Sequence, residues 1–324
     1  TNMILISCLG IIYGLGAYLV LTRQLTVGNV IALGLYFQLL EQPFFELTNM
    51  GINTHVILPI LERLDKYDEL IQEEPGELDE NFEFSNIKVS NLNFAYEYEN
   101  SEKEIRKTDI LNNVTLDIPK KGLVILRGAS GSGKSTFIRI LMGLLPIERE
   151  MVFFGDADIN DITHSTLRKC FAYVPQDLEL LNDTFYNNLT YGLEDIAIED
   201  VKKVCRRIKL SSRIESAENT YNTVINEKAD LSGGEKQRIS IARAIMKNSP
   251  IIVLDEATAN VDPENEAELM NAIEALTKEK TVIMIAHRLK TVRSADSIIV
   301  IDSGKIAQQG THDELMRQDG IYRS

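Results

Sequence analysis

Hydrophobic residues dominate the first part of the chain. Residues 3–21 carry no charge, and as a helix they would cover roughly 30 Å, about the thickness of a bilayer's hydrocarbon core. A polar turn at 22–26 precedes a second apolar stretch from residue 27 to about residue 40. This stretch keeps an apolar character to residue 60, interrupted by Glu41, Pro43 and Glu46, and Pro43 is expected to kink the helix. Because both segments are apolar all round, the pattern favours an all-α transmembrane helical hairpin over a hairpin buried in a soluble core.

The pattern changes near Leu61, where apolar residues recur at helical spacing with charged residues between them. This helix is expected to leave the membrane and to end before Pro75 and Gly76, which break helices. An acidic stretch follows. The predicted organisation is therefore a transmembrane region over residues 1–71, a linker over 72–84 and a second domain over 85–324.

Short β-rich runs alternate with helical runs in the second domain. The predicted strands are KVSNLNF, VTLDI, LVILRG, CFAYV, PIIVLD, TVIMIAH and DSIIVID. Helical patterns follow Lys134, Gly233 and Pro263, which predicts an α/β fold with parallel strands. The first strands have no helices between them, so an added antiparallel sheet is expected.

Composition excludes several classes of protein. The 324 residues are 44% hydrophobic, enough for about two domains, and the net charge of −14 argues against nucleic acid as a partner. Cys8, Cys170 and Cys205 have no paired spacing, so neither a disulfide framework nor a zinc site is expected. A reducing compartment fits this pattern.

A glycine-rich run, GASGSGKST, follows the strand LVILRG and opens a helical run. The glycines let the backbone turn its N–H groups toward phosphate oxygens, and the helix N-terminus adds a partial positive charge. Lys134 is expected to reach the terminal phosphates of ATP, and the Ser135 hydroxyl to ligate Mg²⁺. The predicted ATP-binding residues are Gly128, Ala129, Ser130, Gly131, Ser132, Gly133, Lys134, Ser135 and Thr136.

Two carboxylates end the apolar strand IIVLDE. Asp255 is expected to hold Mg²⁺ through water, and Glu256 to act as the general base that polarises the attacking water. An acid after a strand is often only a helix cap, but here it stands directly beside the motif described next.

The run ADLSGGEKQRISIARAI followed by IIVLDEATANVD resembles the ABC ATPase family. The resemblance implies a P-loop NTPase with a RecA-like core, an antiparallel β subdomain and a helical subdomain that carries the LSGGE signature. In the family, the signature binds the γ-phosphate held by a second subunit, so ATP joins a dimer. The corresponding residues are Ser232, Gly233, Gly234 and Glu235.

Other family landmarks match single residues. Tyr96 resembles the aromatic residue that stacks on adenine, with Phe94 and Tyr98 as nearby rivals. The remaining matches are Gln176, which touches Mg²⁺ and the attacking water; Asp262, in the loop that crosses the dimer; and His287, which contacts the γ-phosphate. The resemblance thus implies catalytic roles for Glu256, His287 and Gln176, and metal ligation by Ser135, Gln176 and Asp255.

The whole chain resembles the exporter branch, in which permease and ATPase share one polypeptide. Residues 1–71 are similar to the last two of six permease spans, so four further spans are expected before them or on another chain. The implied protein is a multi-pass protein of the plasma or inner membrane with its ATPase domain in the cytoplasm. Its expected partners are a second ABC subunit, identical or different, the lipid bilayer and an unidentified transported substrate.

Departures from the family pattern keep a second hypothesis open. Glu235 stands where the family has glutamine, the dimer-crossing loop reads Ala-Asn-Val-Asp up to Asp262, and the segment before the signature is one residue short. This shortening affects the permease contact expected at Asn226 and Glu227. The alternative is a regulatory or channel-like module that binds ATP and hydrolyses little of it. A soluble ABC ATPase of DNA repair or translation would need coiled coils or a second phosphate loop.

Overall fold

The computed structural model describes residues 2–68, 76–78, 82, 84–99, 104–176, 179–226, 231–256, 263–286 and 293–323. The chain divides into two compact units, Thr1–Glu74 and Pro75–Ser324. This division lies within the predicted linker over residues 72–84.

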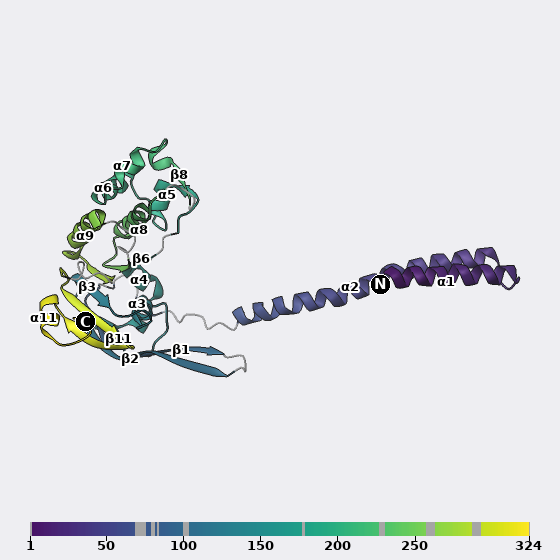
Figure 1. Ribbon diagram of the computed structural model, residues 1–324, viewed down its shortest axis with the longest axis horizontal. Helices are drawn as coiled ribbons and strands as arrows, with labels where there is room; N and C mark the ends of the chain where they lie inside the picture. Colours follow the sequence, from purple (N-terminus) through teal and green to yellow (C-terminus); the bar gives the residue numbers. More distant parts are fainter. Residues whose placement is uncertain are drawn as a thin grey trace. The chain divides into compact units, whose positions relative to one another are not determined.

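The first unit consists of two helices that contact each other, α1 (Asn2–Leu21) and α2 (Val27–Asp68) (Figure 1). Gly16 is buried against Val30, and a Cβ at Gly16 would lie 2.6 Å from Val30 Cγ1. The small residue therefore lets the helices approach closely. The predicted helix continues through Pro43 and Pro59 to Asp68.

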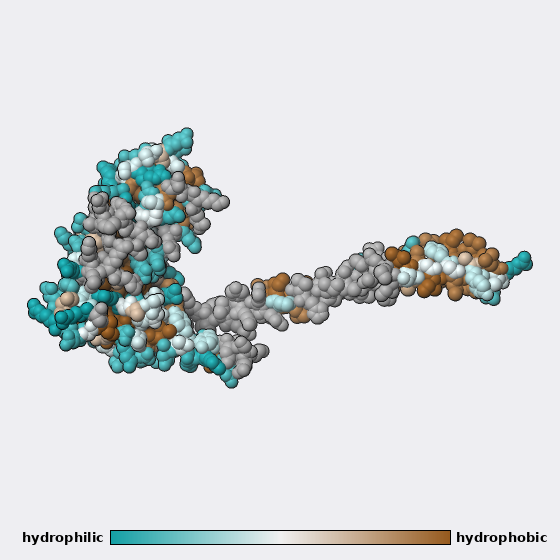
Figure 2. Space-filling view, viewed as in Figure 1, coloured by the Kyte–Doolittle hydropathy of each residue, from teal (hydrophilic) through white to brown (hydrophobic). Residues whose placement is uncertain are grey.

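Large apolar side chains cover the outside of these helices. Ile6, Leu21 and Leu39 are each more than 70% exposed, and Figure 2 shows hydrophobic residues gathered over α1 and the adjoining part of α2. Over the residues that the structure describes, however, neither helix satisfies both the length and the hydropathy of a membrane span. The structure thus does not confirm the predicted crossing.

Within its described residues, the second unit contains three sheets. The largest has the order β12-β11-β3-β10-β9-β6, a second has the order β2-β1-β4-β5, and the third pairs β7 with β8. The strands are β1 (Ile87–Glu99), β2 (Ile105–Ile118), β3 (Gly122–Arg127), β4 (Val152–Phe154), β5 (Ala157–Asp158), β6 (Phe171–Val174), β7 (Asp183–Thr184), β8 (Val224–Ile225), β9 (Ile251–Asp255), β10 (Thr281–Ile285), β11 (Ser297–Asp302) and β12 (Lys305–Gly310).

The helices of this unit lie between the strands along the chain, except α11, which follows β12. They are α3 (Lys134–Leu141), α4 (His164–Cys170), α5 (Phe185–Thr190), α6 (Ile198–Arg207), α7 (Ser211–Glu215), α8 (Gly233–Lys247), α9 (Pro263–Thr277) and α11 (His312–Arg317), with 3₁₀ turns η1 (Ile159–Asp161) and η2 (Thr220–Asn222). In Figure 1, α5, α6, α7 and β8 gather in a region of their own, beside α8.

The six-stranded sheet confirms the predicted α/β core. β11, β3, β10, β9 and β6 pair in parallel, and β12 joins antiparallel at one edge. β3 and β10 are buried along their length, with alternate residues in two different hydrophobic clusters, as expected of parallel strands covered on both faces. The sheet β2-β1-β4-β5 is antiparallel, as predicted from the lack of intervening helices.

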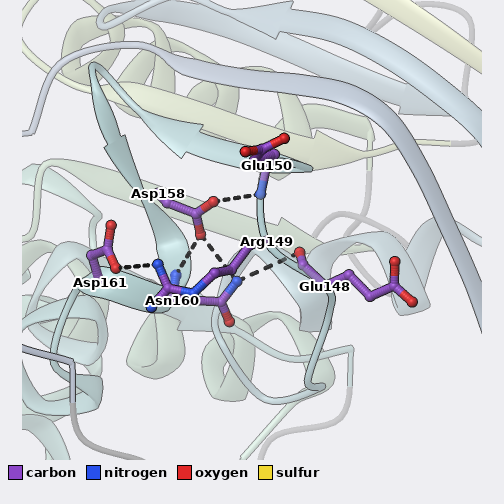
Figure 3. A network of polar contacts seen from close by, with 6 residues as sticks. All are labelled: Glu148, Arg149, Glu150, Asp158, Asn160 and Asp161. Carbon is purple, nitrogen blue, oxygen red and sulfur yellow. Dashed lines mark hydrogen bonds and ion pairs between the residues drawn. The ribbon is translucent and has the colours of Figure 1, made fainter.

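A buried carboxylate joins the segment before β4 to the 3₁₀ turn η1 that follows β5 (Figure 3). The Asp158 side chain is 7% exposed and accepts hydrogen bonds from the amides of Glu150, at 2.6 Å, and Asn160, at 2.9 Å. Arg149 pairs with Asp161 at 2.7 Å. These contacts fix the chain that leads into α4.

The start of the second unit pairs with this same segment. The Leu78 amide donates to the Asp161 carbonyl at 2.9 Å, and the Leu78 carbonyl accepts from the Thr163 amide at 3.0 Å. Thr163 is also the N-cap of α4, because its hydroxyl accepts from the Thr166 amide. Residues 76–78 of the predicted linker are therefore attached to the second unit.

Asn188 joins α5 to α8 through a buried hydrogen-bond network. Its side chain is fully buried, donates to the Leu181 and Thr184 carbonyls and accepts from the Leu181 amide. Arg243 on α8 donates to both the carbonyl and the side-chain oxygen of Asn188. Each polar atom of the amide thus has a partner, as buried polar groups require.

Replacing Asn188 with Ala is expected to lower the free energy of unfolding by about 3 kcal/mol, because the Leu181 amide, the Thr184 carbonyl and one nitrogen of the Arg243 guanidinium lose the side chain that they bond. Urea unfolding of the variant measures this loss. Asn187→Ala is the matched control on the exposed side of the same helix, and its effect should stay within about 0.5 kcal/mol. Equal losses in the two variants would contradict the role of the buried network.

Candidate nucleotide-binding site

The glycine-rich loop connects the buried strand β3 to helix α3, as predicted. Gly131 and Gly133 have φ values of 76° and 106°, in the region that side chains disfavour. A Cβ at Gly133 would also lie 2.8 Å from Leu111 Cδ2 on β2. Glycine at 133 is therefore required both by the backbone conformation and by the close packing of β2.

The turn between β11 and β12 also holds the loop in place. The Gly304 amide in this turn donates to the Ser132 carbonyl at 3.3 Å, and the Gly304 carbonyl accepts from the Asn112 amide at 2.8 Å. Because Gly133, the N-cap of α3, has no side chain, none caps the first amides of this helix. An uncapped helix N-terminus favours a bound anion.

Lys134 lies folded over the loop. Its Nζ donates to the carbonyls of Gly128, at 2.9 Å, and Ala129, at 2.8 Å, and the residue is 7% exposed. Burial lowers the pKa of the Lys134 ammonium, and the negative charges of Glu256 and Asp255 partly oppose this shift. The structure thus brings together the predicted phosphate-binding lysine and both predicted carboxylates.

Both carboxylates lie at the end of β9. β3 and β9 flank β10 in parallel, so their carboxyl ends share one edge of the sheet, where ligands of such sheets bind. Glu256 has a φ of 49°, which is uncommon for a residue other than glycine and turns the chain directly after the strand. Strained backbone of this kind is frequent at functional sites.

The predicted Mg²⁺ ligands are oxygen donors. Ser135 is exposed in the first turn of α3, Gln176 is exposed just beyond β6, and Asp255 ends β9. Across the described part of the chain, no group of three or more His, Cys, Asp or Glu side chains could form a metal cage. This donor set fits Mg²⁺, which takes few protein oxygens and completes its shell with water and substrate phosphates.

The signature segment begins α8 with a capping box. The Ser232 hydroxyl accepts from the Glu235 amide at 3.2 Å, and the Glu235 carboxylate accepts from the Ser232 amide at 2.7 Å. Arg213 of α7 pairs with the same carboxylate at 3.3 Å. Glu235 therefore orients the serine and has a cationic partner within its own chain; its predicted contact with ATP stays a prediction.

The predicted adenine-binding residue lies on β1, next to the strand that packs on the phosphate loop. Tyr96 and Phe94 are half-buried, with their rings edge to face and their centroids 5.1 Å apart, whereas Tyr98 is exposed. Phe94 pairs with Leu111 of β2, which contacts Gly133. This proximity is compatible with each of the three aromatic residues, so the choice of Tyr96 stays a prediction.

Two predicted site residues, Asp262 and His287, lie outside the described residues, as does Glu227. Sequence reasoning missed two partners that the structure places at the site. Tyr173 donates its hydroxyl to Asp255 at 2.8 Å, and Arg213 pairs with Glu235. For the first of these contacts, the sequence signal is the tyrosine within the otherwise apolar run of β6, FAYV.

Strand, glycine loop, buried lysine and two adjacent carboxylates define a P-loop NTPase domain. Residues 111–259 match the family model described as ABC transporter. The domain that contains these residues belongs to the ABC transporter family.

Several relatives have names that refer to transport, lipid flipping or multidrug resistance. ABC transporter B family member 6 of Dictyostelium discoideum is 32% identical over 95% of this chain, and the multidrug resistance-like ATP-binding protein MdlB of Buchnera aphidicola is 35% identical over 91%. The ATP-dependent lipid A-core flippase of Vibrio vulnificus is 38% identical over 73%. The chain covers 48%, 50% and 40% of these relatives, respectively, so it spans about half of their length or less.

A solved structure matches the chain in fold. A bacterial Atm1-family ABC exporter with ATP bound has a TM-score of 0.72 and 30% sequence identity. The match covers 93% of this chain and 52% of the exporter chain.

Proposed function

We propose that the chain is the ATP-hydrolysing part of an ABC exporter and that its substrate crosses a membrane at the expense of ATP. The observation that carries this proposal is the position of the buried Lys134. Its ammonium bonds two carbonyls of the glycine loop, and the charges of Glu256 and Asp255 act on it. Phosphate binding and water activation then take place at one edge of one sheet.

In this proposal the loop amides and the N-terminus of α3 receive the phosphates, and Lys134 exchanges its two carbonyl partners for phosphate oxygens. Ser135, Gln176 and Asp255 would hold Mg²⁺, which neutralises phosphate charge. Glu256 accepts a proton from the attacking water, and His287 is assigned to the γ-phosphate by family resemblance. Tyr96 is assigned to the adenine.

We further propose that two subunits are needed for turnover. Ser232, Gly233 and Gly234 open α8 on the exposed or half-exposed surface of the domain, so a second copy or a related subunit can present its ATP to them. Glu235 and Asp262 are the other residues proposed to face the partner's nucleotide.

The membrane part of the proposal concerns residues 1–71. The exposed apolar side chains of α1 and α2 favour lipid as their surroundings, and these helices would form part of the permease, with the ATPase domain in the cytoplasm. One relative is named for multidrug resistance and another for flipping of lipid A-core. The proposed activity is therefore export, with no class of substrate assigned.

Release of inorganic phosphate by the 324-residue chain with Mg²⁺ and ATP tests the proposal. Turnover that requires Mg²⁺ supports an ATP-driven exporter. Bound ATP with a zero rate of phosphate release would instead favour a regulatory or channel-like ABC module.

A further inference from the structure

Tyr173 links the edge strand of the main sheet to the proposed metal ligand. β6 and β9 are parallel neighbours in which Tyr173 pairs with Val253, two residues before Asp255. From this position the Tyr173 hydroxyl donates to Asp255 Oδ2 at 2.8 Å. The contact uses only one of the two carboxylate oxygens.

The phenol is suited to act as a lasting donor. A tyrosine hydroxyl has an ordinary pKa of about 10 and is therefore protonated at neutral pH. A neutral donor holds the carboxylate in place without competing with a cation for charge.

We propose that Tyr173 is a positioning residue for Mg²⁺: it holds Oδ2 of Asp255, so that the other carboxylate oxygen is presented to the metal's bound water. This inference rests on the proposed function, in which Asp255 is a Mg²⁺ partner. Outer-shell hydrogen bonds orient metal-ligating carboxylates in this way, and their loss typically weakens metal affinity by about 10- to 100-fold.

A packing role for the ring is the simpler alternative. Tyr173 is 42% exposed and lines a cavity of about 470 Å³ together with Leu144, Phe171 and Tyr191. Tyr173→Phe separates the two roles, because phenylalanine keeps the ring in the cavity and removes only the hydroxyl.

The test uses the 324-residue chain, the non-hydrolysable analogue AMP-PNP and Mn²⁺ as a spectroscopic substitute for Mg²⁺. Electron paramagnetic resonance of free Mn²⁺ reports metal affinity in the presence of saturating AMP-PNP. Tyr173→Phe is expected to weaken Mn²⁺ binding by about tenfold. Its affinity for AMP-PNP in EDTA should equal that of the parent chain, since the hydroxyl acts only through the metal ligand.

Two further variants make the result specific. Tyr191→Phe removes a hydroxyl from the lining of the same cavity and should leave Mn²⁺ affinity unchanged, because the Tyr191 ring lies beside Arg243 and not beside Asp255. In an Asp255→Asn background, Tyr173→Phe should cause little further loss, since both changes act on one metal contact.

Unchanged Mn²⁺ affinity in Tyr173→Phe would overturn the inference, as would an equal loss of AMP-PNP binding with and without metal. A full additional tenfold loss in the Asp255→Asn background would also overturn it. A parent chain that binds neither AMP-PNP nor Mn²⁺ would instead reject the proposed function itself.

Discussion

Replacing Glu256 with Gln is expected to leave ATP binding intact and to cut ATP turnover by ~10²-fold or more, the usual scale for losing a general base. Glutamine keeps the size of the side chain directly after β9 but cannot take a proton from water. Phosphate release measures turnover, and equilibrium binding of ATP measures the step that should not change.

Glu279→Gln is a suitable control, because it makes the same chemical change at an exposed position between α9 and β10. Its turnover should equal that of the parent chain. Undiminished turnover in Glu256→Gln would show that another group accepts the proton. A loss of ATP binding in this variant would mean that Glu256 supports the phosphate loop instead of the chemistry.

Replacing Gly234 with Asp should separate folding and ATP binding from turnover. No heavy atom lies within 4 Å of a Cβ built at Gly234, and an acid in the first turn of α8 suits the helix dipole. The folded monomer should therefore tolerate the change. If a partner's γ-phosphate docks on this helix end, the like charge costs several kcal/mol, and turnover should fall by ~10²-fold or more.

Ser212→Asp is the matched control for added charge. It places the same acid in the first turn of α7, at an exposed position. Thermal unfolding and ATP binding should be unchanged in both variants, and only Gly234→Asp should lose phosphate release. Normal turnover in Gly234→Asp would contradict the proposed contact with a second subunit.

The core of the second unit could be predicted because its signals are local. β3, β9 and β10 are short runs of mostly apolar residues, and parallel buried strands have this composition. The phosphate loop combines glycines, a lysine and a following helix within nine residues, from Gly128 to Thr136. Such a motif carries its own structural context.

Contacts between distant segments could not be predicted in the same way. The Tyr173 and Asp255 pair depends on which strands are neighbours and on their register, and the Arg213 and Glu235 pair depends on how α7 packs beside α8. Glu235 illustrates the difference: the sequence shows only that it stands where the family has glutamine, whereas the structure shows that its carboxylate caps α8 and pairs with Arg213.

The first unit shows the limits of hydropathy as a signal. The apolar stretches and the helix-breaking residues 75 and 76 predicted two helices, the second of which continues beyond residue 60, and α1 and α2 follow this pattern. Whether a helix crosses a membrane depends on its surroundings as well as on its sequence. The predicted crossing therefore needs a direct test, such as partition of the chain into vesicles.

A crosslinking measurement on the ATP-loaded chain tests the central claim most directly. Glu256→Gln would carry one cysteine in place of Ser130, in the phosphate loop, and one in place of Lys236, near the start of α8. A short thiol crosslinker should join the two positions between different copies only when ATP and Mg²⁺ are present, giving a covalent dimer. An ATP-bound chain that stays monomeric in solution and forms no such crosslink would contradict a nucleotide shared between two subunits.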